Sequence, residues 1–130
     1  MEPLKIVATE DTPAITFDKE ENIFELSGRS LPEDVNSFFE PIINWIEAYR
    51  EDALDQTVFD FKLEYFNTAS SKLLLDLLML LEEIQEDGAS EITVNWYYHE
   101  DDEDMEEAGE EYAELVEITF ELKPIKDEDY

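Results

Sequence analysis

The sequence predicts an α/β fold in which helices pack on a single mixed β-sheet. Residues 57–66 alternate apolar and polar side chains, which is typical of a strand with one buried face. A leucine-rich helical segment follows and ends at Gly88, and Glu91–Tyr98 has the composition of another strand. Because this strand–helix–strand order has short connections, we expect a crossover with the two strands parallel and close in the sheet.

Three short strands are expected near the N-terminus. They are Leu4–Ala8, Ala14–Asp18 and Asn22–Gly28. The polar turn "DKEEN" between the second and the third indicates that these two strands pair as a β-hairpin. An antiparallel hairpin together with a parallel crossover makes the expected sheet a mixed one.

The first helix is expected to begin near residue 30. Ser30 stands three residues before Glu33, which is the spacing of a capping box. Apolar side chains then recur at helical intervals, at Val35, Phe38, Phe39, Ile42, Ile46 and Tyr49. Pro41 falls within this pattern, and its ring clashes with the preceding turn, so we expect a bend there.

The strand at residues 57–66 is expected to carry two different faces. One face has Phe59, Phe61, Leu63 and Tyr65, and the other has Val58, Asp60, Lys62 and Glu64. Beyond Glu91–Tyr98 an acidic run covers residues 99–114, and the last strand is expected at Leu115–Lys123. No repeat or linker interrupts this order, so residues 1–130 are predicted to form one domain, with 126–130 as a flexible tail.

The charge balance excludes several classes of partner. The chain has 37 Asp and Glu against 8 Lys and Arg, a formal net charge of -29, so nucleic acid and anionic membranes should be repelled.

With no cysteine, disulfides and Cys-based zinc sites are excluded. The longest apolar stretch, Leu77–Leu81, is too short to span a bilayer, and "MEPLKIVATED" does not resemble a signal peptide. We expect a soluble, cytoplasmic protein.

The sequence gives little support to catalysis or metal binding. His99 is the single imidazole and lies beside Glu100 and Asp101, but such a residue at a strand end is more often a solvated boundary residue than a general base. A phosphate-binding glycine loop is not found. The run "EDDEDMEE" lacks the alternating ligands and central glycine of a calcium loop, so a solvated acidic face is favoured. We expect no enzyme activity, cofactor or metal.

The cluster "NTASSK" at the start of the leucine-rich helix has two interpretations. As a helix cap, Asn67 or Thr68 would accept hydrogen bonds from the free amides of the first turn, where Ser70 and Ser71 are also tolerated. The same helix end, with Asn67, Ala69, Ser70 and Ser71, could instead support a phosphate placed on Thr68. The two interpretations are compatible, since a cap in one state can be a phosphorylation site in another.

The leucine-rich helix has more apolar residues than one buried face needs. At about 100° per residue, a wide stripe of Leu73, Leu77, Leu80, Leu81 and Ile84, flanked by Leu74, should pack on the sheet. Leu75 and Met79 fall on the opposite side, in line with Thr68 and Lys72. This ridge of Lys72, Leu75 and Met79 is a candidate partner surface. The alternative is that the first helix or the acidic segment covers Leu75 and Met79.

Several separated blocks of the chain resemble the SiaC family of bacterial regulatory phosphoproteins. They are "LSGRSLPEDVNSFFEPIINWIEAY", "FKLEYFNTASSKLLLDLL", "VNWYYHEDDEDMEEAGEEYAEL" and "FEL", in the same order over nearly the whole chain from Leu4 to Lys123. The resemblance implies a small α/β fold similar in outline to the anti-sigma-factor antagonists, which are STAS-like. It also implies reversible phosphorylation of the threonine of the "NTASSK" block, here Thr68.

The resemblance further implies the partners. A dedicated protein kinase would add the phosphate and a PP2C-type phosphatase would remove it. The unphosphorylated form would bind and activate a GGDEF-type diguanylate cyclase, and so control cyclic di-GMP and biofilm formation. Two alternatives stay open: an anti-sigma-factor antagonist of a partner-switching pathway, and an acidic module that binds metal ions or basic proteins through "EDDEDMEE".

Overall fold

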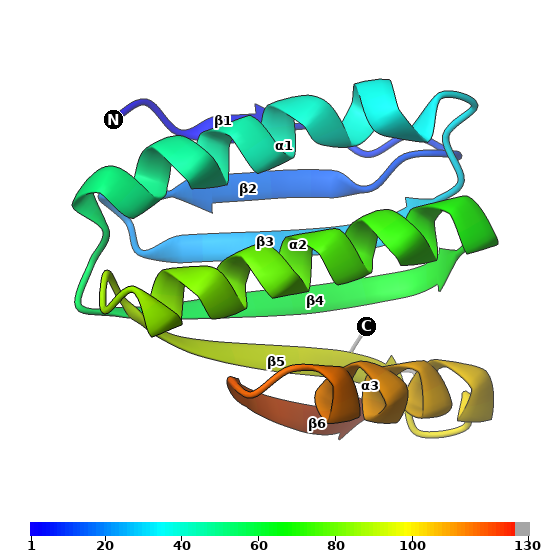
Figure 1. The fold of residues 1–130 in the computed structure, drawn as a ribbon. Helices are drawn as coiled ribbons and strands as arrows, with labels where there is room; N and C mark the ends of the chain where they lie inside the picture. The colour runs from blue at the N-terminus through cyan, green and yellow to red at the C-terminus, as the bar shows by residue number, and fades with distance from the viewer. Residues whose placement is uncertain (127–130) are drawn as a thin grey trace.

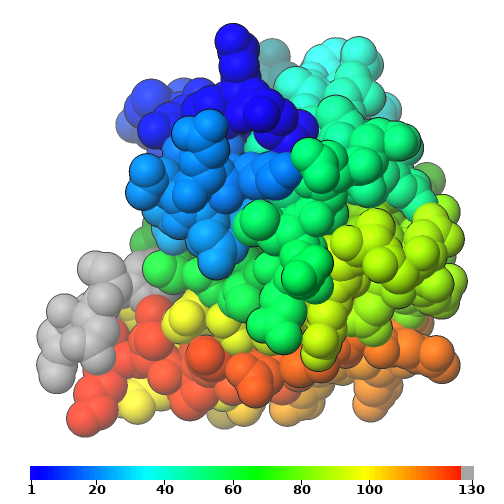
Figure 2. Space-filling view, turned by 90° about the vertical axis from the view of Figure 1, so that its left-hand side faces the viewer, coloured from blue at the N-terminus to red at the C-terminus, as the bar shows by residue number. Residues whose placement is uncertain are grey.

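Three helices cover one face of a six-stranded β-sheet in the computed structural model, which describes residues 1–126 (Figure 1). The strands are β1 (Leu4–Ile6), β2 (Ala14–Asp18), β3 (Ile23–Ser30), β4 (Gln56–Phe66), β5 (Glu91–His99) and β6 (Thr119–Ile125). The helices are α1 (Val35–Tyr49), α2 (Thr68–Glu86) and α3 (Glu103–Leu115), and a 3-10 turn, η1, covers Arg50–Asp52. In the end-on view of Figure 2, α1 and α2 lie to the right of β2 and β6. The predicted mixed α/β class is confirmed.

The strands follow one another across the sheet in chain order. β1, β2 and β3 pair antiparallel, whereas β3, β4, β5 and β6 pair parallel, which confirms both the predicted hairpin and the predicted crossover. The carboxyl ends of parallel strands meet at one edge of a sheet, and in α/β proteins that edge commonly carries the functional site. Ser30, Phe66 and His99 end their strands at this edge, and α2 begins there.

The core lies between the sheet and the helices. The buried apolar residues of α2 are Leu74, Leu77, Leu78, Leu80, Leu81 and Ile84. Leu78 was not among the predicted residues, whereas the predicted Leu73 is half-buried and packs against the core. Aromatic rings pack α1 on the sheet, with Trp45 5.3 Å from Phe17 and Tyr49 5.1 Å from Phe24 between ring centroids. The buried leucines of α2 face the sheet and α1, which leaves the side of α2 that carries Lys72 and Met79 facing outward.

The predicted start of the first helix is wrong. Asp34 caps α1, and its side chain accepts a hydrogen bond from the Ser37 amide at 3.2 Å. Ser30 instead ends β3, is fully buried and pairs with Phe66 of β4. Ser30 lies four residues before the cap of α1 and its hydroxyl donates to Ser70 Oγ instead, so the Ser30–Glu33 spacing was coincidental. Pro41 lies inside α1, and the bend there stays a prediction.

The face assignment of β4 is right as far as Leu63 and wrong beyond it. Phe59, Phe61 and Leu63 are buried, but Tyr65 is 50% exposed. Leu63 pairs with Gly28 and Tyr65 with Arg29, so the register shifts and Glu64 is an extra residue. Such a bulge reverses the alternation of side chains. Phe66 therefore packs against the core in place of Tyr65.

The acidic run forms a helix that was not predicted from the sequence. Asp102 caps α3, accepting a hydrogen bond from the Met105 amide at 3.0 Å, and Met105, Gly109 and Tyr112 are its buried residues. Because α3 continues to Leu115, β6 begins at Thr119 rather than at the predicted Leu115. The helix lies over β5 and β6 (Figure 1). Of the predicted tail, residues 127–130 lie outside the described residues.

Candidate functional site

The start of α2 has a defined hydrogen-bonded cap. Asn67 is the N-cap residue, and its Oδ1 accepts a hydrogen bond from the Ser70 amide at 2.9 Å. Its own amide donates to the Ser30 carbonyl at 3.0 Å, and its carbonyl accepts from the Ser71 amide at 3.0 Å. The predicted cap is thus confirmed for Asn67. The amides of Thr68 and Ala69 precede the first intrahelical hydrogen bonds and point toward this end of the helix.

The three hydroxyl residues of this turn have different surroundings. Thr68 is the first residue of α2 and is exposed, as is Ala69. Ser70 is fully buried, and its Oγ donates to the Ser30 carbonyl at 2.9 Å while it accepts from Ser30 Oγ at 2.8 Å. Ser71 is half-buried, and its Oγ donates to the Thr68 carbonyl at 2.7 Å. Of these hydroxyls, that of Thr68 is the one presented to solvent by an exposed residue.

Two neighbouring elements hold this turn in place. The Ser30–Ser70 hydroxyl pair ties it to the end of β3. The hydroxyl of Tyr112 on α3 donates to the Ser71 carbonyl at 2.8 Å. Burial, and then the charge of Glu111, raise the pKa of Tyr112, so this phenol stays a donor well above neutral pH. The first turn of α2 is therefore fixed from two sides while Thr68 stays accessible.

The predicted ridge on α2 is only partly exposed. Lys72 is exposed and Met79 is 49% exposed, but Leu75 is half-buried and packs against the core. Leu75 projects from the flank of α2 that also carries Ser71 and Glu82, both hydrogen-bonded to the α3 region. The outward face of α2 thus presents Thr68, Lys72 and Met79, with Leu75 at its margin.

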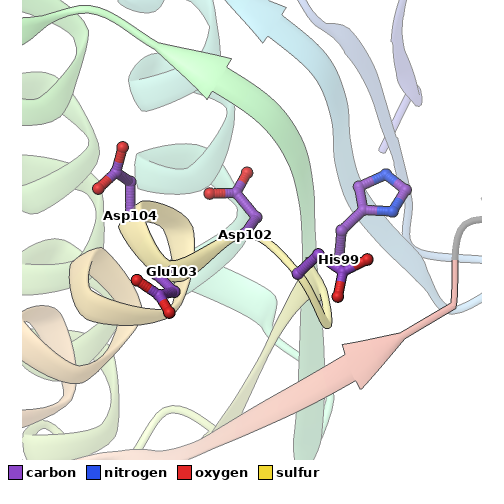
Figure 3. A pocket seen from close by; sticks show the side chains of 5 residues that line it. His99, Asp102, Glu103 and Asp104 are labelled. Atoms are coloured by element: carbon purple, nitrogen blue, oxygen red, sulfur yellow. The ribbon is translucent and has the colours of Figure 1, made fainter.

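The acidic residues near His99 line a separate, open pocket. It has a volume of about 500 Å³ and is lined by His99, Asp101, Asp102, Glu103 and Asp104. Figure 3 shows the ring of His99 pointing away from the carboxylates of Asp102, Glu103 and Asp104, which spread from the start of α3. Among residues 1–126, His, Asp and Glu side chains form no group of three or more suited to holding a metal ion. Within the same range, no helix is both long and apolar enough to cross a membrane.

Comparison with known proteins shows which family this chain resembles in sequence and in fold. Residues 6–125 match the family described as SiaC family regulatory phosphoprotein. The chain belongs to the SiaC family. The resemblance seen in the separated sequence blocks is thereby confirmed over nearly the whole chain.

Solved structures agree with this membership. SiaC of Pseudomonas aeruginosa is 31% identical, with a TM-score of 0.87 over 96% of this chain and 100% of that one. A crystal structure of the diguanylate cyclase SiaD in complex with its activator SiaC, also from Pseudomonas aeruginosa, matches at 32% identity with a TM-score of 0.87, over 94% of this chain and 99% of that one. An uncharacterized protein of strain UCBPP-PA14 of that species is 32% identical, over 95% of this chain and 97% of its own length.

Two residues that hold the site in this SiaC family member were not recognised from the sequence. Ser30 was assigned to a helix cap, although it anchors Ser70. Tyr112 lies in the acidic run, where the helical spacing of Met105, Gly109 and Tyr112 was the available signal. Neither residue has chemistry of its own here, and each acts by positioning the first turn of α2.

Proposed function

We propose that this chain is a non-enzymatic signalling adaptor that binds and activates a GGDEF-type diguanylate cyclase in a manner controlled by phosphorylation of Thr68. The observation that carries the proposal is the close match, over 99% of the relative's chain, to a SiaC protein solved as the activator in a complex with a diguanylate cyclase. A single domain of the same fold and family is expected to present a related surface. The product, cyclic di-GMP, would link this chain to biofilm control.

The surroundings of Thr68 support its role as phosphoacceptor. It is exposed at the start of α2, where unpaired amides and the helix dipole favour a negative group. Ser70 is fully buried and hydrogen-bonded to Ser30, which makes it a poor substrate for a kinase. A cognate protein kinase would add the phosphate and a PP2C-type phosphatase would remove it.

The effect of the phosphate on partner binding follows from charge. It adds about -1.5 to -2 charges at neutral pH, next to the outward face of α2. Lys72 lies one helical turn from Thr68 and is exposed, so its ammonium would be drawn to the phosphate. We infer that Lys72, Met79 and the exposed part of the Leu75 side chain form part of the partner surface. Phosphorylation of Thr68 would then weaken binding of the cyclase to this surface.

The test is a reconstitution with the purified cyclase. Synthesis of cyclic di-GMP is measured with unphosphorylated protein, with stoichiometrically phosphorylated protein and with Thr68→Ala. The unphosphorylated protein and Thr68→Ala should both activate, because the substitution removes the phosphoacceptor and not the surface. Phosphorylated protein should activate poorly. Equal activation in the two phosphorylation states would contradict the switch, and no activation in either state would contradict the adaptor function itself.

A further inference from the structure

A second pocket lies between the end of β4 and the start of α3, and its lining reaches Phe66, two residues before Thr68. We call it the β4–α3 pocket; it has a volume of about 300 Å³. Its apolar part is formed by Phe66, Met105 and Ala108, and its polar part by Glu64, Asp102 and Asp104, with Tyr65 completing the lining. Ligand pockets span roughly 300–1,000 Å³, so this one lies at the small end of that range and has room for one long side chain.

The lining combines an apolar floor with a negatively charged rim. Met105 is only 6% exposed, and Phe66 and Ala108 are half-buried and pack against the core. Glu64 and Asp104 are exposed carboxylates, and Asp102 is half-buried at the cap of α3. The rim sits on a chain of net charge -29, so the surrounding field also favours a positive ligand.

A side chain that satisfies both parts must be apolar along its stem and positively charged at its end. Arginine and lysine have this build, since they bury their methylene groups along apolar surface and keep the charged group at a polar rim. Arginine is favoured because its planar guanidinium pairs with carboxylates through two hydrogen bonds and stacks on aromatic rings. The protein's own Arg29 shows this chemistry, with its guanidinium carbon 5.8 Å from the centre of the Tyr65 ring.

We propose that the β4–α3 pocket receives an arginine side chain of the partner protein, next to the phosphorylation site. The pocket lining reaches Phe66, two residues before Thr68, so partner binding there and phosphorylation would affect the same few residues. This inference rests on the proposed adaptor function for the identity of the partner. The ability of the pocket to hold a guanidinium does not depend on that function and can be measured without the cyclase.

The first experiment titrates the full chain with N-acetyl-arginine amide and follows the methyl NMR signals of Met105 and Ala108. N-acetyl-citrulline amide, which has nearly the same shape without the charge, is the matched probe. The arginine probe should shift both signals along a saturable curve, and the citrulline probe should bind more weakly. Equal shifts with the two probes, or no saturable shift with the arginine probe, would overturn the proposal.

Variants that remove charge from the pocket rim or from a distant turn show whether the pocket itself binds the arginine probe. Glu64→Gln with Asp104→Asn keeps the shape of the rim and leaves the α3 cap Asp102 in place. Glu20→Gln with Glu21→Gln makes the same change in charge at two exposed residues of the β2–β3 turn. Exposed ion pairs contribute little each, so the rim variant should weaken arginine-probe binding about two- to tenfold, and the turn variant should not. Equal weakening in both variants would mean that net charge, and not the pocket, attracts the probe.

The same two variants in the cyclase assay test the identity of the occupant. The rim variant should need more protein than the turn variant for half-maximal activation of the cyclase. If both activate like the unsubstituted chain, the assignment of the pocket to a cyclase arginine is overturned even where the adaptor function holds. If the unsubstituted chain fails to activate the cyclase, the proposed function fails, and the NMR titration still decides whether the pocket binds a guanidinium.

Discussion

Thr68 and Ser70 lie two residues apart in one helical turn, yet their hydroxyls have opposite surroundings. Thr68 is exposed, whereas Ser70 is fully buried and exchanges hydrogen bonds with Ser30. A phosphate on Ser70 would have to displace the end of β3, while a phosphate on Thr68 meets free amides at the helix end. The local sequence alone does not show which of these hydroxyls is the better phosphoacceptor, whereas the difference in their burial does.

The corresponding prediction is a single phosphorylation site. Incubation with the cognate kinase and ATP should add one phosphate, on Thr68, and Thr68→Ala should accept none. Peptide mapping by mass spectrometry measures this directly, with Ser71→Ala as the control because Ser71 is the other hydroxyl residue of the turn that is not fully buried. Phosphate found mainly on Ser70, Ser71 or Thr57 would show that the assignment is wrong.

At the scale of the element, the packing of α3 depends on one small residue, Gly109. A Cβ atom at Gly109 would lie 2.5 Å from Trp96 Cδ1 and in conflict with the Leu122 side chain. Trp96 is almost fully buried, and its indole nitrogen donates to the Met105 carbonyl at 3.0 Å, so the ring has little freedom to move away. The close approach of α3 to β5 and β6 therefore requires glycine.

Gly109→Ala should accordingly destabilise the fold. Overpacking of a filled core costs about 1–3 kcal/mol, which equals or exceeds the gain in helix propensity of about 1 kcal/mol from replacing glycine by alanine. Urea unfolding followed by circular dichroism measures the change in the free energy of unfolding. Glu110→Ala, at the adjacent exposed position, is the control and should have little effect. A Gly109→Ala protein as stable as the unsubstituted chain would mean that α3 can shift outward at no cost.

The hydrogen bond from Tyr112 on α3 to Ser71 on α2 predicts that the free energy of unfolding falls at alkaline pH. The raised pKa of Tyr112 means that the folded chain keeps the phenol proton at pH values where the unfolded chain has lost it. The resulting stabilisation is complete below the unfolded pKa of about 10 and declines as pH rises above it. Tyr98, whose pKa is raised by burial and by Glu106, adds to the same slope.

Tyr112→Phe separates the two effects of this side chain. At pH 8 it should cost about 0.5–1.5 kcal/mol, the net contribution of the hydrogen bond to Ser71. Above pH 10 the stability of the variant should fall less steeply than that of the unsubstituted chain, because one titrating group is gone. Urea unfolding at pH 8, 10 and 11 tests both points. Parallel pH dependences for the two proteins would exclude Tyr112 as a source of the alkaline slope.

The outward face of α2 gives a prediction about partner binding. Met79 is 49% exposed, so Met79→Glu should leave the fold intact and weaken cyclase binding by about 1–3 kcal/mol, the range for an interface anchor. Leu75→Glu places a charge against the core and should also destabilise the domain. Leu77→Ala, in the buried stripe, should cost about 2–5 kcal/mol of stability. Calorimetric binding and thermal melts separate these outcomes; normal cyclase binding by folded Met79→Glu would place the partner surface elsewhere.

For the whole molecule, the sequence predicted the layers better than their local irregularities. Period-two alternation located β4, and leucine spacing located α2, because burial of one face leaves a periodic pattern. The bulge at Glu64 left no such pattern, since one inserted residue reverses the alternation only for the last two residues of β4. The helical spacing of the few apolar residues of α3 was not recognised in the sequence, because acidic residues of its exposed face surround them. At the site, the capping role of Asn67 was predictable, but the long-range partners Ser30 and Tyr112 were not.

The charge of the whole molecule gives the last prediction. With 37 acidic against 8 basic residues, carboxylates far outnumber the cations that could pair with them, and their mutual repulsion opposes the compact state. The observed ion pairs, such as Lys19–Asp52 and Lys62–Glu25, lie at the surface, where each is worth about 0–1 kcal/mol. Raising ionic strength from 0.01 M to 0.15 M shortens the Debye length from about 30 Å to about 8 Å. Repulsion between distant charges is therefore screened more than attraction within close pairs.

Thermal melting should consequently shift upward with salt. A gain of about 1–2 kcal/mol would raise Tm by about 3–10 °C for a domain of this size. Sodium chloride and tetramethylammonium chloride should act alike at equal ionic strength, because screening does not depend on the identity of the cation. Calcium chloride at the same ionic strength is the discriminating control: a distinctly larger shift would indicate specific binding to the acidic segment and would favour a metal-binding module. A Tm that falls between 0.01 M and 0.15 M salt would mean that attractive pairs outweigh the net repulsion in this fold.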